Sequence, residues 1–327
     1  MIETLEEKLK ANYIFADVAD RVAKRISAKL VGGAYDSDRT VGDFAGALTR
    51  DLREVGDDKH FRVGYQPDFK ERPRDGKPPS KDELEQMKRD TVQHGAGIAK
   101  VEWLSGNVGY LDLRGFAPAD FVASAYASAM NLLADTDALI VDLRRNGGGD
   151  PSAVAVFMSH FFAEDDSRHL NDLRWRAENR TQEFWTVPVQ GARYTKPVYV
   201  LISPRTFSGG EECAYDFQTQ KRATLIGETT GGGANPGDRF ALGHGLVAFI
   251  PTGQAINPIT NKNWEHVGVK PDVAVPPADA LKTAYATILE TQIAAEKDAR
   301  RLQMLKDTLA RVEKNEEEKP DFMPPRH

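Results

Sequence analysis

Two short apolar runs constrain the fold of this chain more than any other feature of its sequence. Residues 138–143 and 197–203 are rich in branched aliphatic side chains and have the length of a strand rather than a helix. Such runs are typical of parallel strands that are buried on both faces. Helical segments follow them, near Pro151 and over residues 213–221. Alternation of strands and helices predicts an α/β core.

Further segments extend this core at both ends. Residues 14–31 and 38–53 place apolar side chains on one helical face, which predicts a small helical subdomain near the N-terminus. Residues 277–316 predict one long helix with a charged tail. We expect four parts: a helical N-terminal subdomain (1–66), a linker loop with a short helix (67–95), a core (96–276), and a C-terminal helix with its tail (277–327).

Composition narrows the classes of function. A net charge of −6 argues against a general nucleic-acid-binding protein. The single cysteine, Cys213, excludes an intrachain disulfide and a thiolate metal cluster, and we expect it to be a buried, inert thiol. No apolar run is long enough to cross a bilayer.

Localisation and assembly are less constrained. Residues 1–30 lack the apolar core of a signal peptide. We favour an exported protein, periplasmic or secreted, whose signal has been removed. The sequence is compatible with a homo-oligomer.

Ser208 is the first candidate for chemistry. It lies in Thr-Phe-Ser-Gly-Gly-Glu-Glu (residues 206–212), where a predicted strand gives way to a helix. The free N–H groups of a helix N-terminus can be capped by a serine or can hold a developing oxyanion. Ser208 and Glu211 also form the S-x-x-E capping box, and the motif alone favours a cap over a nucleophile. The Gly-x-Ser-x-Gly elbow is not met, because Thr206 stands at its first glycine.

A second glycine loop, residues 146–149, ends the first apolar run. It lacks both the lysine of a P-loop and the Gly-x-Gly-x-x-Gly spacing, so it is not a phosphate loop. Alone it favours a tight turn. Ligands of parallel sheets gather at the carboxyl ends of the strands. The two glycine loops together could therefore supply backbone N–H donors to one oxyanion.

A serine nucleophile needs a base, and the sequence leaves three histidines open: His60, His94 and His266. We expect His160 and Glu164, four residues apart on a predicted helix, to form a surface pair. No His-Glu-x-x-His or similar spacing occurs, so we expect no metal and no cofactor. The remaining histidines are expected in loops or at the terminus: His169, His244 and His327.

In chain order, these motifs resemble the tail-specific (C-terminal processing) serine peptidases. The closer resemblance is to the branch of tricorn core protease and the interphotoreceptor retinoid-binding protein modules. It implies a crotonase-like, ClpP-like core of stacked ββα units. The marks are residues 142–149, 206–212 and 227–233, supported by Gly-Tyr-Leu-Asp-Leu-Arg-Gly (109–115) and Gly-Val-Lys-Pro-Asp (268–272).

The resemblance also implies roles for single residues. Ser208 would be the nucleophile, and the N–H groups of Gly209 and Gly148 would hold the oxyanion. In the processing branch a lysine about 25 residues after the serine acts as base, but here Gly233 stands at that position. A Ser–Lys dyad is therefore not available.

The tricorn-like branch uses a histidine and a glutamate instead. These correspond to His60, as the base, and Glu265, which would orient the imidazole directly or through a neighbouring group. Lys59 replaces the serine that precedes the histidine in tricorn. If the segment around Glu265 is extended, His266 points to the opposite face and is a poorer candidate for the base.

Many relatives carry a PDZ domain between the histidine segment and the core. Only about thirty residues separate Tyr65 from Ile98, too few for that fold. Recognition of substrate tails by that route is not expected, whereas peptide binding by strand addition remains possible.

We therefore expect a serine endopeptidase that hydrolyses peptide bonds in unfolded or partly degraded polypeptides with a Ser–His–Glu arrangement. The alternative is a non-hydrolytic binder of retinoid or fatty-acid-like ligands on the same scaffold. Acyl-CoA chemistry is a third possibility, but no feature of the sequence marks a CoA site.

Overall fold

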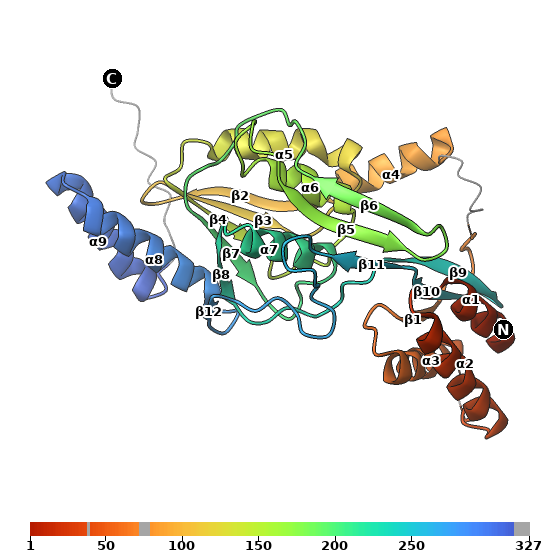
Figure 1. Ribbon diagram of the computed structural model, residues 1–327. Helices are drawn as coiled ribbons and strands as arrows, with labels where there is room; N and C mark the ends of the chain where they lie inside the picture. Colours follow the sequence, from red (N-terminus) through yellow and green to blue (C-terminus); the bar gives the residue numbers. More distant parts are fainter. Residues whose placement is uncertain (38–39, 72–78, 317–327) are drawn as a thin grey trace.

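A six-stranded sheet forms the centre of the molecule (Figure 1). The computed structural model describes residues 1–37, 40–71 and 79–316. The sheet has the order β12-β8-β7-β4-β3-β2, and all neighbours are parallel except the β2–β3 hairpin. Its strands confirm the predicted α/β core: β2 (Ile98–Leu104), β3 (Val108–Leu113), β4 (Ala138–Asp142), β7 (Val198–Ile202), β8 (Thr224–Gly227) and β12 (Val273–Ala274).

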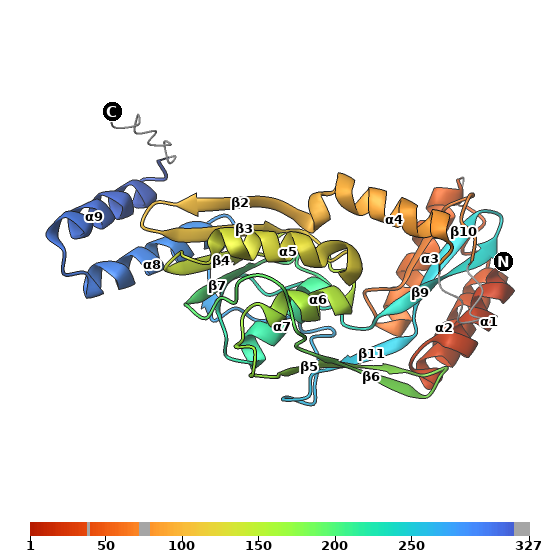
Figure 2. The same ribbon diagram turned by 90° about the horizontal axis from the view of Figure 1, so that it is seen from above.

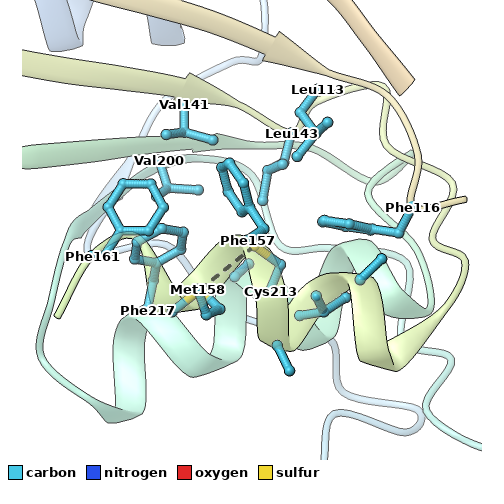
Figure 3. Close-up of a cluster of buried hydrophobic side chains, with 14 of the residues drawn as sticks. Leu113, Phe116, Val141, Leu143, Phe157, Met158, Phe161, Val200, Cys213 and Phe217 are labelled. Carbon is cyan, nitrogen blue, oxygen red and sulfur yellow. Dashed lines mark hydrogen bonds between the residues drawn. The ribbon is translucent and has the colours of Figure 1, made fainter. Parts of the chain in front are cut away.

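Three helices cover one face of this sheet: α5 (Ala119–Leu133), α6 (Pro151–Ser159) and α7 (Gly209–Thr219). Successive side chains of a strand point to opposite faces. Val141 of β4 accordingly packs in the cluster with Phe157 and Phe217 (Figure 3), whereas Ile140 packs in the cluster on the other face. Cys213 lies inside the first cluster with its Sγ 3.9 Å from Met158 Sδ, so the expected burial of its thiol is confirmed.

The opposite face is covered by α8 (Ala280–Ala295), against which α9 (Ala299–Glu313) folds back (Figure 2). The prediction of one long helix over residues 277–316 is therefore wrong. The chain turns at Glu296, which is extended, and Asp298 caps the new helix by accepting a hydrogen bond from the Arg301 N–H. The turn lets Leu305 pack into the cluster beneath the sheet. The charged tail beyond residue 316 lies outside the described residues.

A second sheet, β11-β5-β6, lies beside α7 and carries part of the site described below. A hairpin supplies two strands of this sheet. Its strands are β5 (His169–Trp175) and β6 (Arg180–Trp185), with β11 (Gly253–Ile256) paired antiparallel to β5.

The N-terminal helices pack on a third sheet, β1-β10-β9, at the end of the molecule opposite the C-terminal helix pair (Figures 1 and 2). Strand β1 comes from the N-terminal part of the chain, but its partners come much later in the sequence. The elements are α1 (Ile2–Asn12), α2 (Ala16–Val31), α3 (Val41–Gly56), β1 (Arg62–Tyr65), β9 (Gly237–Gly243) and β10 (Leu246–Pro251).

Between β1 and the central sheet the chain forms α4 (Lys81–Gln93) and the short 3-10 helix η1 (Gly95–Gly97). The Pro-, Lys- and Arg-rich loop before α4 lies partly outside the described residues. Among the helices that the structure describes, none combines the length and the hydropathy that a membrane span requires.

Candidate active site

Ser208 occupies a strained turn between β7 and α7. Its φ of 55° and ψ of −125° are rare for a residue with a side chain. Strain of this kind gathers at functional sites, and a serine on a sharp strand-to-helix turn is the geometry of a nucleophile elbow. Thr206 supports the turn in place of the missing glycine, because its fully buried hydroxyl donates to the Leu143 carbonyl and accepts from the Ser203 N–H.

Glu211 accepts hydrogen bonds that an interaction with the helix dipole alone would not explain. Its carboxylate is fully buried and accepts the Ser208 N–H at 3.0 Å, which is the returning half of the expected capping box. It also accepts the N–H groups of Gly232 and Gly233 and the hydroxyl of Thr230. Burial raises the pKa of this carboxyl group, and the hydrogen bonds oppose that shift. Glu211 thereby holds the elbow and the glycine loop in one arrangement.

Ser208 opens into a cavity of about 520 Å³ that it shares with His60. Part of the wall comes from the second sheet, and most of it is apolar. A cavity of this size accommodates a side chain or a small ligand. The apolar wall consists of Leu173, Trp175, Phe184, Phe207 and Phe249.

His60 lies just before β1, between two aromatic rings of that cavity. Its imidazole centroid is 4.7 Å from that of Phe207 and 5.9 Å from that of Phe249, which is nearly parallel to it. Burial lowers the pKa of His60 to about 4, helped by the charge of Arg53. The imidazole is therefore neutral near pH 7, as a general base must be. No hydrogen bond joins His60 to Ser208 in this arrangement of the described residues.

Two buried carboxylates, Asp58 and Glu265, face His60. One ligating atom from each of the three residues lies within 4.8 Å of the others. Asp58 Oδ1 is 3.9 Å from His60 Nδ1. Within the described part of the chain, His60 Nδ1 and Glu265 Oε1 are buried and lack a hydrogen-bond partner. The structure thus brings His60 and Glu265 together, as the family pattern implied, and adds Asp58.

Asp58 was missed by the sequence reasoning. It is almost fully buried and accepts hydrogen bonds from the His60 N–H at 3.0 Å, from Asn235 Nδ2 at 2.9 Å and from the Tyr13 hydroxyl at 3.4 Å. An aspartate two residues before a histidine can form such a turn locally, and that spacing was the available signal. Its contacts with Asn235 and Tyr13 left no signal in the sequence.

The charge of Asp58 affects the protonation of Glu265. Burial, followed by the charge of Asp58, raises the pKa of Glu265 to about 7, although the Ala234 and Asn235 N–H groups bind its Oε2. Burial also raises the pKa of Asp58. A positive charge placed between these two carboxyl groups would lower the pKa of both.

Among the described residues, Asp58, His60 and Glu265 form the one group whose side-chain atoms are close enough together to ligate a metal ion. Imidazole and carboxylate are ligands that zinc accepts. A metal bound there would occupy the imidazole that Ser208 would need as a base. The two uses of this group exclude each other.

The two glycine loops meet at the N-terminus of α7. A Cβ atom placed on Gly148 would lie 2.7 Å from the Gly209 nitrogen, and one placed on Gly209 would lie 3.0 Å from the Gly149 nitrogen. Gly209 is the first residue of α7, where backbone N–H groups have no partner within the helix. Only glycine permits an approach this close.

Gly148 itself requires a correction. Its N–H donates to Asn146 Oδ1 at 2.8 Å, so it is not free to hold an oxyanion. Gly149 lines the cavity beside Ser208, whereas Gly148 does not. In the described part of the chain the Gly149 N–H has no hydrogen-bond acceptor, which makes it the better donor.

Gly233, at the position of the lysine of the processing branch, has no room for a side chain. A Cβ atom on Gly233 would lie 2.3 Å from Phe207 Cζ and 3.0 Å from His60 Cε1. A side chain at this position would displace the two rings. The described arrangement therefore leaves no room for a lysine at residue 233. Lys59 points elsewhere, because its Nζ donates to the Gly231 carbonyl.

Of the other histidines that the structure describes, none lines the cavity of Ser208. His94 is exposed at the end of α4, and His266 is half-exposed near Asp57. The expected surface pair of His160 and Glu164 is wrong, because His160 is fully buried with its Nδ1 at 3.0 Å from the Ala192 carbonyl.

Two of the three histidines expected in loops or at the terminus are described. His169 does not lie in a loop, since it begins β5 and stacks on Trp185. His244 lies in the turn between β9 and β10, as expected. His327 lies outside the described residues.

Comparison with known proteins gives consistent matches. Residues 107–275 match the model of peptidase family S41. Residues 1–95 match the N-terminal domain of Peptidase_S41 in eukaryotic IRBP. The carboxy-terminal processing protease CtpA of Bacillus subtilis (strain 168) is 26% identical over 202 residues, which cover 61% of this chain and 41% of that protein. The chain thus spans about two fifths of that relative's length.

Solved structures share the fold. A candidate peptidase from Parabacteroides merdae ATCC 43184 aligns with a TM-score of 0.61 and 17% identity over 90% of this chain and 98% of its own. The tricorn protease aligns with a TM-score of 0.51 and 14% identity over 96% of this chain and 36% of its own. At these identities the likeness concerns the fold alone.

Proposed function

The chain belongs to peptidase family S41, a family of serine peptidases, and on this premise we propose that it hydrolyses peptide bonds within unfolded or partly degraded polypeptides. The observation that carries the proposal is the strained backbone of Ser208 at the start of α7, in a cavity shared with a neutral His60. A helix cap needs no such strain, because capping residues ordinarily adopt extended backbone angles.

The chemistry follows from the order of groups around the cavity. His60 accepts the Ser208 hydroxyl proton as Oγ attacks the carbonyl carbon, and returns it to the leaving amine. Water, activated by the same imidazole, then releases the acyl group from Ser208. The developing oxyanion is held by the N–H groups of Gly209 and Gly149, at the positive end of the α7 dipole.

Glu265 and Asp58 act on His60 rather than on substrate. A proton taken up by the imidazole becomes a positive charge beside two buried carboxyl groups. Attraction at this distance stabilises the charged intermediate, as the carboxylate does in other triads. Glu265 is the proposed orienting residue, and Asp58 shares that task.

Labelling with a fluorophosphonate tests the nucleophile. The folded protein is expected to be modified at Ser208, while Ser208→Ala, His60→Ala and heat-denatured protein are not. A known serine protease in the same assay verifies the probe. Modification that persists in Ser208→Ala, or its absence from the folded native protein, contradicts the proposal.

The apolar cavity wall favours one second candidate function, the binding of a retinoid or fatty-acid-like ligand without hydrolysis. This function would not need the Ser208 hydroxyl. It predicts saturable retinol or fatty-acid binding that is equal in the native protein and in Ser208→Ala, together with an absence of fluorophosphonate labelling.

A further inference from the structure

The group formed by Asp58, His60 and Glu265 has the composition of a three-ligand zinc site. None of the three side chains is more than 9% exposed. His60 Nδ1 and Glu265 Oε1 lack a hydrogen-bond partner among the described residues. Asp58 Oδ1 accepts the His60 N–H, and a carboxylate oxygen has room for a second interaction. One imidazole nitrogen and two carboxylate oxygens, with a fourth position left for water, form an open zinc site.

The spacing of these side chains suits a single ion. One ligating atom of each residue lies within 4.8 Å of the others, and Asp58 Oδ1 is 3.9 Å from His60 Nδ1. Tetrahedral zinc, at about 2.1 Å from each ligand, separates its ligand atoms by about 3.4 Å. Small rotations of the two side chains would therefore bring Asp58 and His60 to the separation that zinc requires.

Neighbouring groups orient both carboxylates. Asp58 Oδ2 accepts hydrogen bonds from Asn235 Nδ2 at 2.9 Å and from the Tyr13 hydroxyl at 3.4 Å. Glu265 Oε2 accepts the N–H groups of Ala234 and Asn235. In each carboxylate the protein thus fixes one oxygen, while the other remains able to ligate. Outer hydrogen bonds of this kind typically orient the ligands of a metal site.

A half-exposed histidine that the proposed mechanism does not use, His266, connects this group with solvent. The chain turns at residues 264–268, and His266 has a left-handed φ of 66°, which costs free energy in a residue with a side chain. Because the segment is not extended, His266 Nδ1 lies 3.9 Å from Glu265 Oε1, and it lies 3.5 Å from Oδ2 of the exposed Asp57. Side chains that can ligate a metal therefore form a continuous series from Asp57 at the surface to His60.

We propose that Zn²⁺ enters past His266, binds to Asp58, His60 and Glu265, and reversibly switches the enzyme off. The metal site itself is independent of the peptidase function proposed above, whereas its inhibitory effect rests on that function. Zinc held by Nδ1 leaves a neutral imidazole with its one proton on Nε2. The ring then has no free lone pair with which to accept the Ser208 hydroxyl proton. The active form is the metal-free protein.

Zinc binding to Ser208→Ala tests the site independently of turnover, because Ser208 is not one of the ligands. A chromophoric chelator competes with the metal-free variant for Zn²⁺ and gives the stoichiometry and Kd. We expect one Zn²⁺ per chain. Ca²⁺ and Mg²⁺ prefer sites built of oxygen ligands alone, so an equal concentration of either ion should not displace zinc. Absence of zinc binding, or displacement by Ca²⁺, overturns the proposal.

Substitution of the ligands locates the ion. In the Ser208→Ala background, His60→Gln and Glu265→Gln should each weaken zinc binding by about 100-fold. His169→Gln is the matched control. It removes a histidine whose Nε2 also lies beside a carboxylate, 2.7 Å from Asp172 Oδ1, and it should leave Kd unchanged. Circular dichroism verifies that each variant is folded. A Kd that is unaffected by both ligand substitutions, or that is lost in the control, overturns the proposal.

The rates of binding and release test the route of entry. A residue on the path alters the barrier between the free and bound states but not the states themselves. His266→Ala should therefore slow zinc binding and zinc release by the same factor, with Kd unchanged. Stopped-flow mixing with a fluorescent zinc indicator measures both rates. Rates equal to those of the protein with His266 contradict the route, and a weaker Kd would make His266 a ligand instead.

Labelling of the native protein separates this inference from the proposed function. Zn²⁺ should prevent fluorophosphonate modification of Ser208, and a chelator should restore it. A known serine protease, treated in the same way, controls for an effect of zinc on the probe. A metal-free protein that is not labelled contradicts the peptidase function, while Kd still decides the metal site. A protein that binds Zn²⁺ through His60 and is labelled at an unchanged rate overturns the switch and retains the function.

Discussion

Asp58 Oδ1 lies 3.9 Å from His60 Nδ1, and the backbone N–H of His60 donates to the same oxygen at 3.0 Å. One carboxylate therefore fixes the backbone of the proposed base and faces its ring. Because Asp58 is buried away from the substrate cavity, its effect on catalysis must pass through the imidazole.

We expect Asp58→Asn to lower kcat by about tenfold or more, within the range that general acid–base catalysis contributes. The amide oxygen of asparagine can still accept the His60 N–H, but its amide nitrogen replaces the oxygen that accepts from Asn235 and Tyr13, so circular dichroism must verify that the variant is folded. KM should change little, because Asp58 does not line the cavity. Steady-state kinetics on a fluorogenic peptide measures both constants. An unchanged kcat, or a loss confined to KM, contradicts the role.

The pH dependence of kcat/KM should have an unusually low acidic limb. Only neutral His60 can accept a proton, and burial lowers its pKa to about 4. The limb set by His60 is therefore expected at about pH 4, below any decrease that protonation of Glu265 causes near pH 7. Circular dichroism at each pH separates titration from unfolding. A limb near the ordinary histidine value of about 6.5 would show that the imidazole is not desolvated in the free protein.

Glu265→Gln should stabilise the protein at alkaline pH. The folded pKa of Glu265 is raised to about 7 from 4.5, so the folded state binds more protons than the unfolded state between these values. Stability from this group is fully present below pH 4.5 and is lost as the pH rises toward 7.

Glutamine cannot ionise, so the variant does not lose stability from this residue as the pH rises. The Tm of Glu265→Gln minus that of the native protein should thus increase from pH 4.5 to pH 7 and then level off. His60 contributes with the opposite sign, because its lowered pKa costs stability as the pH falls from 6.5 toward 4. Comparison of the two proteins cancels this contribution, since both retain His60. A difference in Tm that is constant with pH contradicts a raised pKa at Glu265.

Gly233→Lys should not create a Ser–Lys dyad. Its Cβ would collide with the Phe207 ring and crowd His60, so we expect lower stability by about 1–3 kcal/mol and loss of activity. Urea denaturation measures the stability. Gly64→Ala is the matched control, because a Cβ there meets nothing within 4 Å. Equal losses of stability from the two substitutions would show that the rings of Phe207 and His60 can move aside at little cost.

Ser208→Gly should be more stable than Ser208→Ala. Both remove the hydroxyl and abolish activity, but only glycine relieves the positive φ of 55°. Strain at such a residue costs of the order of 1 kcal/mol or more, and the difference in free energy of unfolding should approach that value. If alanine is as stable as glycine, the turn is not strained in solution.

The parts of this site that could be predicted are those encoded in short segments. Ser208 and its glycines stand in one motif, and the α/β core follows from two apolar runs. His60 and Glu265 needed the family pattern, because their proximity depends on the packing of the N-terminal part against the core. Asp58 depends on contacts with Tyr13 and Asn235, which no local pattern reveals.

Two errors have a common physical origin. The direction of the Gly148 N–H depends on the Asn146 side chain, and the break between α8 and α9 depends on the packing of Leu305 beneath the sheet. In both places the local sequence permits more than one backbone path. Tertiary contacts select the backbone path. Helical periodicity and glycine content therefore could not predict it.

The pairing of β1 with β10 has a consequence for biosynthesis. His60 emerges from the ribosome early, but the strand that holds its segment, Leu246–Pro251, is made only after most of the chain. Contacts this distant in sequence form late. Until then the proposed base has no fixed place beside Ser208, and we expect the nascent polypeptide to be inactive. Activity is therefore expected only after β10 has been made and has paired with β1.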